Sequence, residues 1–253
     1  MTLLQTIIVA FSMFSALPMP QIEWNSRNMR YSLCAFPLVG AVIGGVCWLW
    51  VWLCGILALP ALLRGAGLCL IPVLLTGGIH LDGYADTWDA LSSHAEPSRK
   101  REILKDSHLG AFAAIRLCVF FVAEFALWTA LPEYRGWAIL CAFCLSRTLS
   151  ALALTLFPLA EGSGLARSFA EASDRKRVRR ILLCLAEALC VVMVFCGGWV
   201  MAAAAAGVFL YYKRMARTRF GGLSGDLAGW FLQTAELWML GGLVFAEYAE
   251  ALL

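Results

Sequence analysis

Residues 36–59 read FPLVGAVIGGVCWLWVWLCGILAL, a stretch without a charged side chain. A helix needs about 20 predominantly apolar residues to cross the hydrocarbon core of a bilayer. Five further stretches are mainly apolar: 65–81, 109–131, 137–158, 181–212 and 227–247. The sequence therefore predicts an all-α protein built as a transmembrane helical bundle.

The composition excludes a water-soluble domain. Hydrophobic residues make up 61% of the 253 residues and charged residues 15%, with a mean hydropathy of +0.77. Soluble domains average about 45–50% apolar and about 25% charged residues. The net charge of +3 gives no sign of nucleic-acid binding. The ten cysteines lie in apolar runs, so we expect neither a disulfide scaffold nor a metal or redox role for the Cys141–Cys144 pair.

Three polar loops, 82–108, 159–180 and 213–226, hold most of the basic residues. By the positive-inside rule all three face the cytoplasm. Two spans separate the first loop from the second. The third loop returns to the same side only if 181–212 is a hairpin that turns near Gly197 and Gly198, and a single long tilted helix is the competing interpretation. We expect one integral membrane domain over 1–253, with six or seven spans. Whether 3–17 crosses the membrane stays open.

One apolar stretch ends in three aspartates, in the sequence GGIHLDGYADTWD at 77–89. On a helix, Asp82, Asp86 and Asp89 fall within an arc of about 60°. Like charges at this spacing repel one another, so the stripe favours a bound cation. Carboxylate oxygens suit Mg²⁺ or Mn²⁺ that bridges to substrate phosphates. The alternative is a solvated helix end. His80 is a candidate ligand or proton donor, or simply a histidine at the membrane interface.

A second polar motif, Lys105-Asp106-Ser107, opens the next apolar stretch. Asp106 or Ser107 is a good helix N-cap, and this role alone accounts for one of them. The functional interpretation makes Asp106 a fourth metal ligand or a base, and Lys105 a cation for phosphate.

The third motif is RFGGLSGD at 219–226, a glycine-rich turn before an apolar stretch. Backbone amides and a helix N-terminus at such a turn can hold an anion, although glycine turns between spans are common. Arg147 lies inside an apolar run, where a buried guanidinium needs a partner, and a phosphate-facing role is one option. Among the glutamates within spans, Glu236 is the one candidate, and a weak one, chosen because it lies two to three turns from Asp226 on the same helix.

Taken together, these motifs resemble those of the cobalamin synthase family, the adenosylcobinamide-GDP ribazoletransferases. The resemblance runs in order from about residue 5 to residue 240 and is carried by His80-Leu81-Asp82-Gly83-x-Ala85-Asp86-x-x-Asp89, Lys105-Asp106-Ser107-x-Leu109-Gly110, Ser146-Arg147, Glu161-Gly162 with Gly164 and Phe169, and Gly221-Gly222-x-x-Gly225-Asp226. The opening Phe14-Ser15-Ala16-Leu17-Pro18-Met19-Pro20 is similar to the family's opening, with Ala16 where arginine is expected.

The resemblance implies a multi-pass enzyme of the cytoplasmic (inner) membrane with its active site on the cytoplasmic side. It would transfer the adenosylcobinamide phosphate moiety from adenosylcobinamide-GDP to α-ribazole or its 5′-phosphate, with Mg²⁺ as cofactor and GMP as leaving group. The implied catalytic and metal-binding residues are Asp82, Asp86, Asp89 and Asp106. The substrate-binding candidates are His80, Lys105, Ser107, Arg147, Arg219, Gly221, Gly222, Gly225 and Asp226. A homo-oligomer or a complex with enzymes of the same pathway stays open.

The sequence departs from the family pattern at three positions: Ala90 follows the last aspartate in place of glycine, Ser224 replaces a common threonine, and Gln233 stands where a carboxylate is expected. The third departure puts a catalytic role for that position in doubt. Competing classes fit less well. Membrane prenyltransferases use their acidic motif twice, and CDP-alcohol phosphotransferases use a longer motif with an arginine. A secondary transporter would show repeated halves with charges near mid-membrane.

Overall fold

The computed structural model describes residues 2–106, 108–132 and 134–252. Over these residues the chain forms twelve helices and no strand, which confirms the all-α prediction. In chain order the helices are α1 (Thr2–Phe14), α2 (Ser26–Met29), α3 (Ser32–Ile56), α4 (Ala61–Thr76), α5 (Ile79–Ser92), α6 (Pro97–Ile103), α7 (Ala111–Ala130), α8 (Gly136–Leu156), α9 (Gly164–Ala172), α10 (Arg175–Phe195), α11 (Trp199–Phe220) and α12 (Gly225–Glu250).

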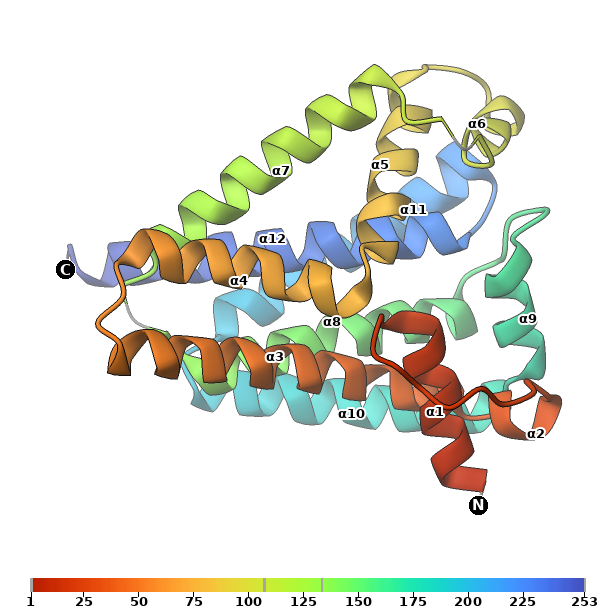
Figure 1. Ribbon diagram of the computed structural model, residues 1–253. Coiled ribbons are helices and arrows are strands. Elements are labelled where there is room, and N and C mark those ends of the chain that lie inside the picture. The colour runs from red at the N-terminus through yellow and green to blue at the C-terminus, as the bar shows by residue number, and fades with distance from the viewer. Residues whose placement is uncertain (1, 107, 133, 253) are drawn as a thin grey trace.

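The long helices run back and forth between two ends of the molecule (Figure 1). The short helices α1, α2, α6 and α9 gather with α5 at one end, on the right of the view, and the turns after α3, α7 and α10 lie at the other. The predicted polar loops all lie at the first end, as the parity argument requires. They are shorter than expected, because α5, α9 and the ends of α10, α11 and α12 extend into them.

Helix α8 lies at the centre of the bundle and packs against α3, α10 and α12. Most of its residues are buried, including its polar Ser146, Arg147 and Thr148. Its contact with α3 is close because two glycines of α3 face it. A Cβ on Gly40 would lie 2.3 Å from the carbonyl oxygen of Phe143, and one on Gly44 would lie 2.8 Å from the Cα of Leu140. Small residues four apart allow membrane helices to approach at backbone distance.

Among the described residues, three helices, α3, α7 and α8, are long and apolar enough to cross a bilayer, which identifies a membrane protein. A fourth candidate is the pair α4 and α5, which is bent by 95°. The predicted number of six or seven spans therefore stays a prediction. Helix α1 is apolar but has only 13 residues, shorter than a span requires.

Two glycine turns decide the path of the chain. The break between α10 and α11 falls at residues 196–198, where Gly197 has a φ of +72°, so the predicted hairpin is confirmed and the single long helix is wrong. The bend between α4 and α5 falls at Gly77 and Gly78, with φ values of +66° and +78°. Glycine adopts this left-handed backbone without the steric cost that a Cβ brings. The bend turns α5 across the end of the bundle.

Candidate active site

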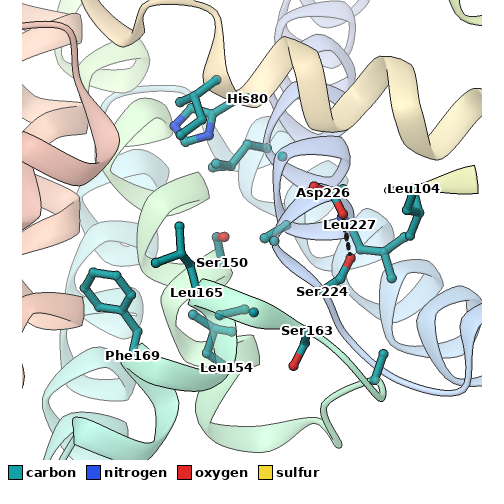
Figure 2. A pocket seen from close by; sticks show the side chains of 18 of the residues that line it. His80, Leu104, Ser150, Leu154, Ser163, Leu165, Phe169, Ser224, Asp226 and Leu227 are labelled. Atoms are coloured by element: carbon teal, nitrogen blue, oxygen red, sulfur yellow. Dashed lines mark hydrogen bonds between the residues drawn. The ribbon is translucent and has the colours of Figure 1, made fainter. Parts of the chain in front are cut away.

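A cavity of about 330 Å³ opens at the end of the bundle where the short helices gather. Its walls come from α1, α3, α5, α8, α9 and the start of α12, together with the segments 101–105 and 160–166. Figure 2 shows Ser224 and Asp226 on one side of it and Leu154, Leu165 and Phe169 across from them. The cavity thus brings together four of the motifs that the sequence singled out.

The two sides of the cavity differ in chemistry. One side, here called the polar wall, consists of Asp82, Arg101, Lys105, Glu161, Ser224 and Asp226. The other, here called the apolar wall, consists of Leu33, Phe36, Ala151, Leu154, Ala166 and Phe169, each less than one-tenth exposed. A concave site with few polar groups and a mainly apolar lining is typical of small-molecule binding.

Helix α5 brings Asp82 of the acidic stripe to the cavity, whereas Asp86 and Asp89 do not line it. The helix packs at backbone distance against α12. A Cβ on Gly83 would lie 2.7 Å from the carbonyl oxygen of Asp226, and one on Gly229 would lie 2.8 Å from the carbonyl oxygen of His80. The two glycines therefore allow a contact that larger residues would prevent. Gly83, the small residue beside Asp82, therefore serves helix packing.

The aspartates of the two helices form one acidic cluster. Asp86 lies within electrostatic reach of Asp82, Asp89 and Asp226, and all three raise the energy of its charged form. Burial raises the pKa of the Asp226 carboxyl above its usual range. Hydrogen bonds from the backbone and from Ser224 partly offset this shift, and the negative charge of Asp82 adds to it. Such a cluster is costly without a compensating cation.

The third aspartate of the stripe has a structural partner of its own. A Cβ on Gly110 would lie 2.1 Å from a carboxylate oxygen of Asp89. Gly110 is the N-cap of α7, so the carboxylate lies against the positive end of that helix dipole. Asp89 therefore stabilises the start of α7 as well as belonging to the acidic stripe.

Backbone geometry requires the glycines at the start of the turn at 221–226. Gly221 ends α11 with a φ of +74°, and Gly222 has a φ of +155°. A Cβ on Gly222 would lie 2.4 Å from the backbone nitrogen of Ala160. A single parallel bridge joins Leu159 to Leu223 there, because the amides of Ala160 and Leu223 donate to Leu223 and Pro158 over 2.9 Å each. The turn thus holds the 158–160 segment at the cavity.

Helix α12 begins directly after this turn. The Ser224 hydroxyl accepts a hydrogen bond from the Leu227 amide at 3.3 Å, which makes Ser224 the N-cap. It also donates to the Asp226 carboxylate at 3.4 Å. Asp226 therefore leaves the capping role to Ser224 and faces the cavity from the first turn of the helix (Figure 2).

Two cations belong to the polar wall. Arg101 donates to the Phe220 carbonyl at 3.1 Å and lies 4.0 Å from the Glu161 carboxylate. Lys105 is exposed, and its Nζ lies 2.9 Å from the position of a Cβ on Gly162. Sequence reasoning named Lys105 and missed Arg101, which carries no local signal because its partners come from distant segments.

Three other predicted site residues, Asp106, Arg219 and Ser107, lie outside the cavity lining or outside the described residues. Asp106 is exposed and bonds at 2.7 Å to His108, whose hydrogen bonds lower the pKa of the Asp106 carboxyl. Arg219 is exposed on the last turn of α11 and lines a separate groove between α11 and α6. Ser107 lies outside the described residues. Gly225 lines the cavity, and a Cβ there would meet open space.

Arg147 is fully buried and forms an ion pair with Glu236, which joins α8 to α12. The Ser146 hydroxyl donates to the same carboxylate at 2.7 Å. The guanidinium predicted to face phosphate thus has a carboxylate partner, whereas His80 does line the cavity and is 5% exposed. The α3 residues Leu33 and Phe36 were not predicted, because an apolar residue of a span gives no sign of the cavity it lines.

The donor set suits a hard divalent cation. Within the described residues, no three His, Cys, Asp or Glu side chains converge closely enough to hold a metal ion as they stand. The carboxylates of α5 and α12 nevertheless supply the oxygen donors that Mg²⁺ prefers when it keeps several waters and binds substrate phosphates.

Comparisons with known proteins agree along the whole chain. A family model described as cobalamin-5-phosphate synthase matches residues 6–244. The adenosylcobinamide-GDP ribazoletransferase of Lachnoclostridium phytofermentans is 40% identical, over 96% of this chain and 95% of its own length. The enzymes of that name from Desulfitobacterium hafniense and Pseudomonas putida are 33% and 34% identical, over 92% and 93% of this chain and 94% and 97% of their own. No solved structure gives a significant match.

Proposed function

The chain belongs to the cobalamin-5-phosphate synthase family, which makes it an adenosylcobinamide-GDP ribazoletransferase of cobalamin synthesis, and we propose that its reaction takes place along the polar wall of the cavity. The observation that carries this proposal is the meeting of four separate motifs in one cavity. Residues of α5, of segments 101–105 and 160–166 and of the turn before α12 all line it.

The reaction joins a ribose hydroxyl of α-ribazole, or of its 5′-phosphate, to the phosphorus that carries the cobinamide. The bond from that phosphorus to GMP breaks, and GMP leaves with the electron pair. We assign the proton of the attacking hydroxyl to Asp106. Asp106 is an exposed carboxylate outside the cavity lining, and it directly follows Lys105, which lines the cavity. Lys105 and Arg101 supply positive charge for the departing phosphate.

We further propose that Asp82, Asp86 and Asp226, with Asp89 as a further member, hold Mg²⁺. Asp82 and Asp226 line the cavity, and Asp86 lies within electrostatic reach of both. When bound, Mg²⁺ would neutralise charge on the pyrophosphate. These carboxylates lie at the α5–α12 contact, where the two helices meet at backbone distance, so the compensating positive charge would be held there.

The cytoplasmic (inner) membrane and a cytoplasm-facing site belong to the same proposal. The basic segments all lie at the cavity end of the molecule, and the positive-inside rule places such an end in the cytoplasm.

The test is release of GMP from adenosylcobinamide-GDP and α-ribazole by protein in liposomes, with Mg²⁺ or with EDTA. We expect turnover in Mg²⁺ and none in EDTA. Asp82→Asn and Asp86→Asn should each lower the turnover rate at least 100-fold. The control variant is Glu102→Gln, because Glu102 is an exposed acid of α6 paired with Arg99, and it should stay within twofold. Equal turnover in EDTA would refute the Mg²⁺ site, and full activity in both aspartate variants would refute the location.

A further inference from the structure

The two substrates of this enzyme differ greatly in size, and the cavity fits one of them. Ligand pockets span roughly 300–1,000 Å³, so a cavity of about 330 Å³ is at the small end. A corrin macrocycle with its nucleotide is far larger than such a space. α-Ribazole, a flat benzimidazole base on a ribose, is a small nucleoside of suitable size.

The apolar wall has the chemistry to contact a flat aromatic ring. The ring centroids of Phe14 and Phe36 lie 4.0 Å apart in a stacked arrangement, and those of Phe14 and Phe169 lie 5.7 Å apart. Phe36 and Phe169 are nearly fully buried, so their rings are fixed by packing. Aromatic side chains favour stacked or edge-to-face contacts with another ring.

One polar side chain at this wall has no partner within the described residues. His80 is 5% exposed, lines the cavity, and its ring centroid lies 5.8 Å from that of Phe36. Its Nε2 is buried without a hydrogen-bond partner. A buried polar atom without a partner is costly, and a ligand that supplies one relieves the cost. The free ring nitrogen of a benzimidazole riboside can accept a hydrogen bond from an imidazole N–H.

We infer that the apolar wall is the subsite for the aromatic base of α-ribazole, with His80 as its polar contact, while the corrin of the donor stays outside the cavity. This inference rests on the proposed function and deepens it. Phe169 and Asp226 lie on opposite sides of the cavity (Figure 2), so with the base against Phe169 the ribose points towards the polar wall, which includes Asp226. The acceptor, α-ribazole, is then held by its base, and its ribose hydroxyl meets the donor at the mouth of the cavity.

The test fills the subsite and measures binding of each substrate separately. Ala166 lines the cavity on α9, whereas Ala170, one turn later on the same helix, is equally buried and does not line it. We expect Ala166→Leu to weaken α-ribazole binding in equilibrium dialysis at least tenfold and Ala170→Leu to stay within twofold. Binding of adenosylcobinamide-GDP, followed by corrin absorbance, should stay within twofold in both variants. D-Ribose 5-phosphate should not displace α-ribazole.

A second variant keeps the test decisive if Ala166→Leu does not fold. Phe169→Leu retains an apolar side chain but removes the ring, and it should weaken α-ribazole binding at least threefold. Unchanged α-ribazole binding in folded Ala166→Leu or Phe169→Leu would overturn the inference. A selective loss of donor binding would do so too, as would an acyl chain found tightly held in the cavity of the purified protein.

The binding and turnover readouts separate this inference from the proposed function. Protein that binds α-ribazole in the subsite but releases no GMP would overturn the function and support the subsite. Protein that releases GMP with the same KM for α-ribazole in Ala166→Leu as in the wild type would support the function and overturn the subsite.

Discussion

At the scale of single residues, the pair of Arg147 and Glu236 shows what a buried charge requires in this bundle. Arg147 is fully buried on α8, and its Nη1 also donates to Ser146 at 3.0 Å and to the Phe143 carbonyl at 3.3 Å. Removing one partner of a buried ion pair leaves a charge without compensation, whereas replacing both with apolar residues of similar volume is often neutral or stabilising.

We therefore expect Glu236→Leu alone to lower the free energy of unfolding by about 3–5 kcal/mol. The double variant Arg147→Met with Glu236→Leu should lose less than either single variant. Unfolding in detergent, followed by the fluorescence of the ten tryptophans, measures both. Additive losses in the double variant would contradict the pairing.

The sequence alone predicted that Arg147 needs a partner, but not which one. Glu236 follows 89 positions later, and only the packing of α8 against α12 brings the two together. The acidic stripe was easier to predict, because Asp82, Asp86 and Asp89 share one helix and their spacing alone fixes the face they occupy. The meeting of that stripe with Asp226 again depends on how α5 packs against α12.

At the scale of elements, the close approach of α3 and α8 depends on the absence of side chains at two positions of α3. Gly40 and Gly44 face α8 at backbone distance, whereas a Cβ on Gly45 of the same helix would meet nothing within 4 Å. The three glycines therefore offer a matched comparison within six residues of one helix.

We predict that Gly40→Ala destabilises the protein by about 1–3 kcal/mol, because the methyl group would force apart two packed backbones. Gly45→Ala should be neutral or stabilising by up to about 1 kcal/mol, since alanine has the higher helix propensity. Thermal unfolding of both variants in the same detergent is the measurement. Equal shifts of Tm in the two variants would show that the helices do not touch at Gly40.

The ends of the elements could be predicted from composition where a glycine or proline follows an apolar run, as at the hairpin between α10 and α11. The bend of 95° between α4 and α5 could not, although Gly77 and Gly78 mark its place. A pair of glycines permits many chain directions, and the contact of α5 with α12 selects this one.

At the scale of the whole molecule, the alternating direction of the long helices places every polar segment that lines the cavity at one end (Figure 1). If the basic segments face the cytoplasm, single cysteines placed at Ser98 on α6, Ser168 on α9 and Thr218 on α11, in a variant whose ten native cysteines are replaced, should react with a membrane-impermeant maleimide in inverted vesicles only. A cysteine at Ala58, in the turn after α3, should react in right-side-out vesicles only.

Labelling of the three cavity-end positions from opposite sides would refute the shared orientation of α6, α9 and α11. Labelling from the same side as Ala58 would refute the bundle's alternation. That the three polar loops lie on the same side could be predicted from the basic residues alone, because the positive-inside rule counts charges and does not depend on packing.

The backbone bridge between Leu159 and Leu223 allows the opening of the cavity wall to be followed by hydrogen exchange. The amides of Ala160 and Leu223 are each held by a carbonyl of the other segment, so they exchange their hydrogens for deuterium only when the two segments part. Their exchange lifetime is thus a direct reading of how often the wall of the cavity comes open. If the acceptor fills the cavity during each catalytic cycle, that lifetime should lengthen when it is bound and shorten again once the enlarged product departs.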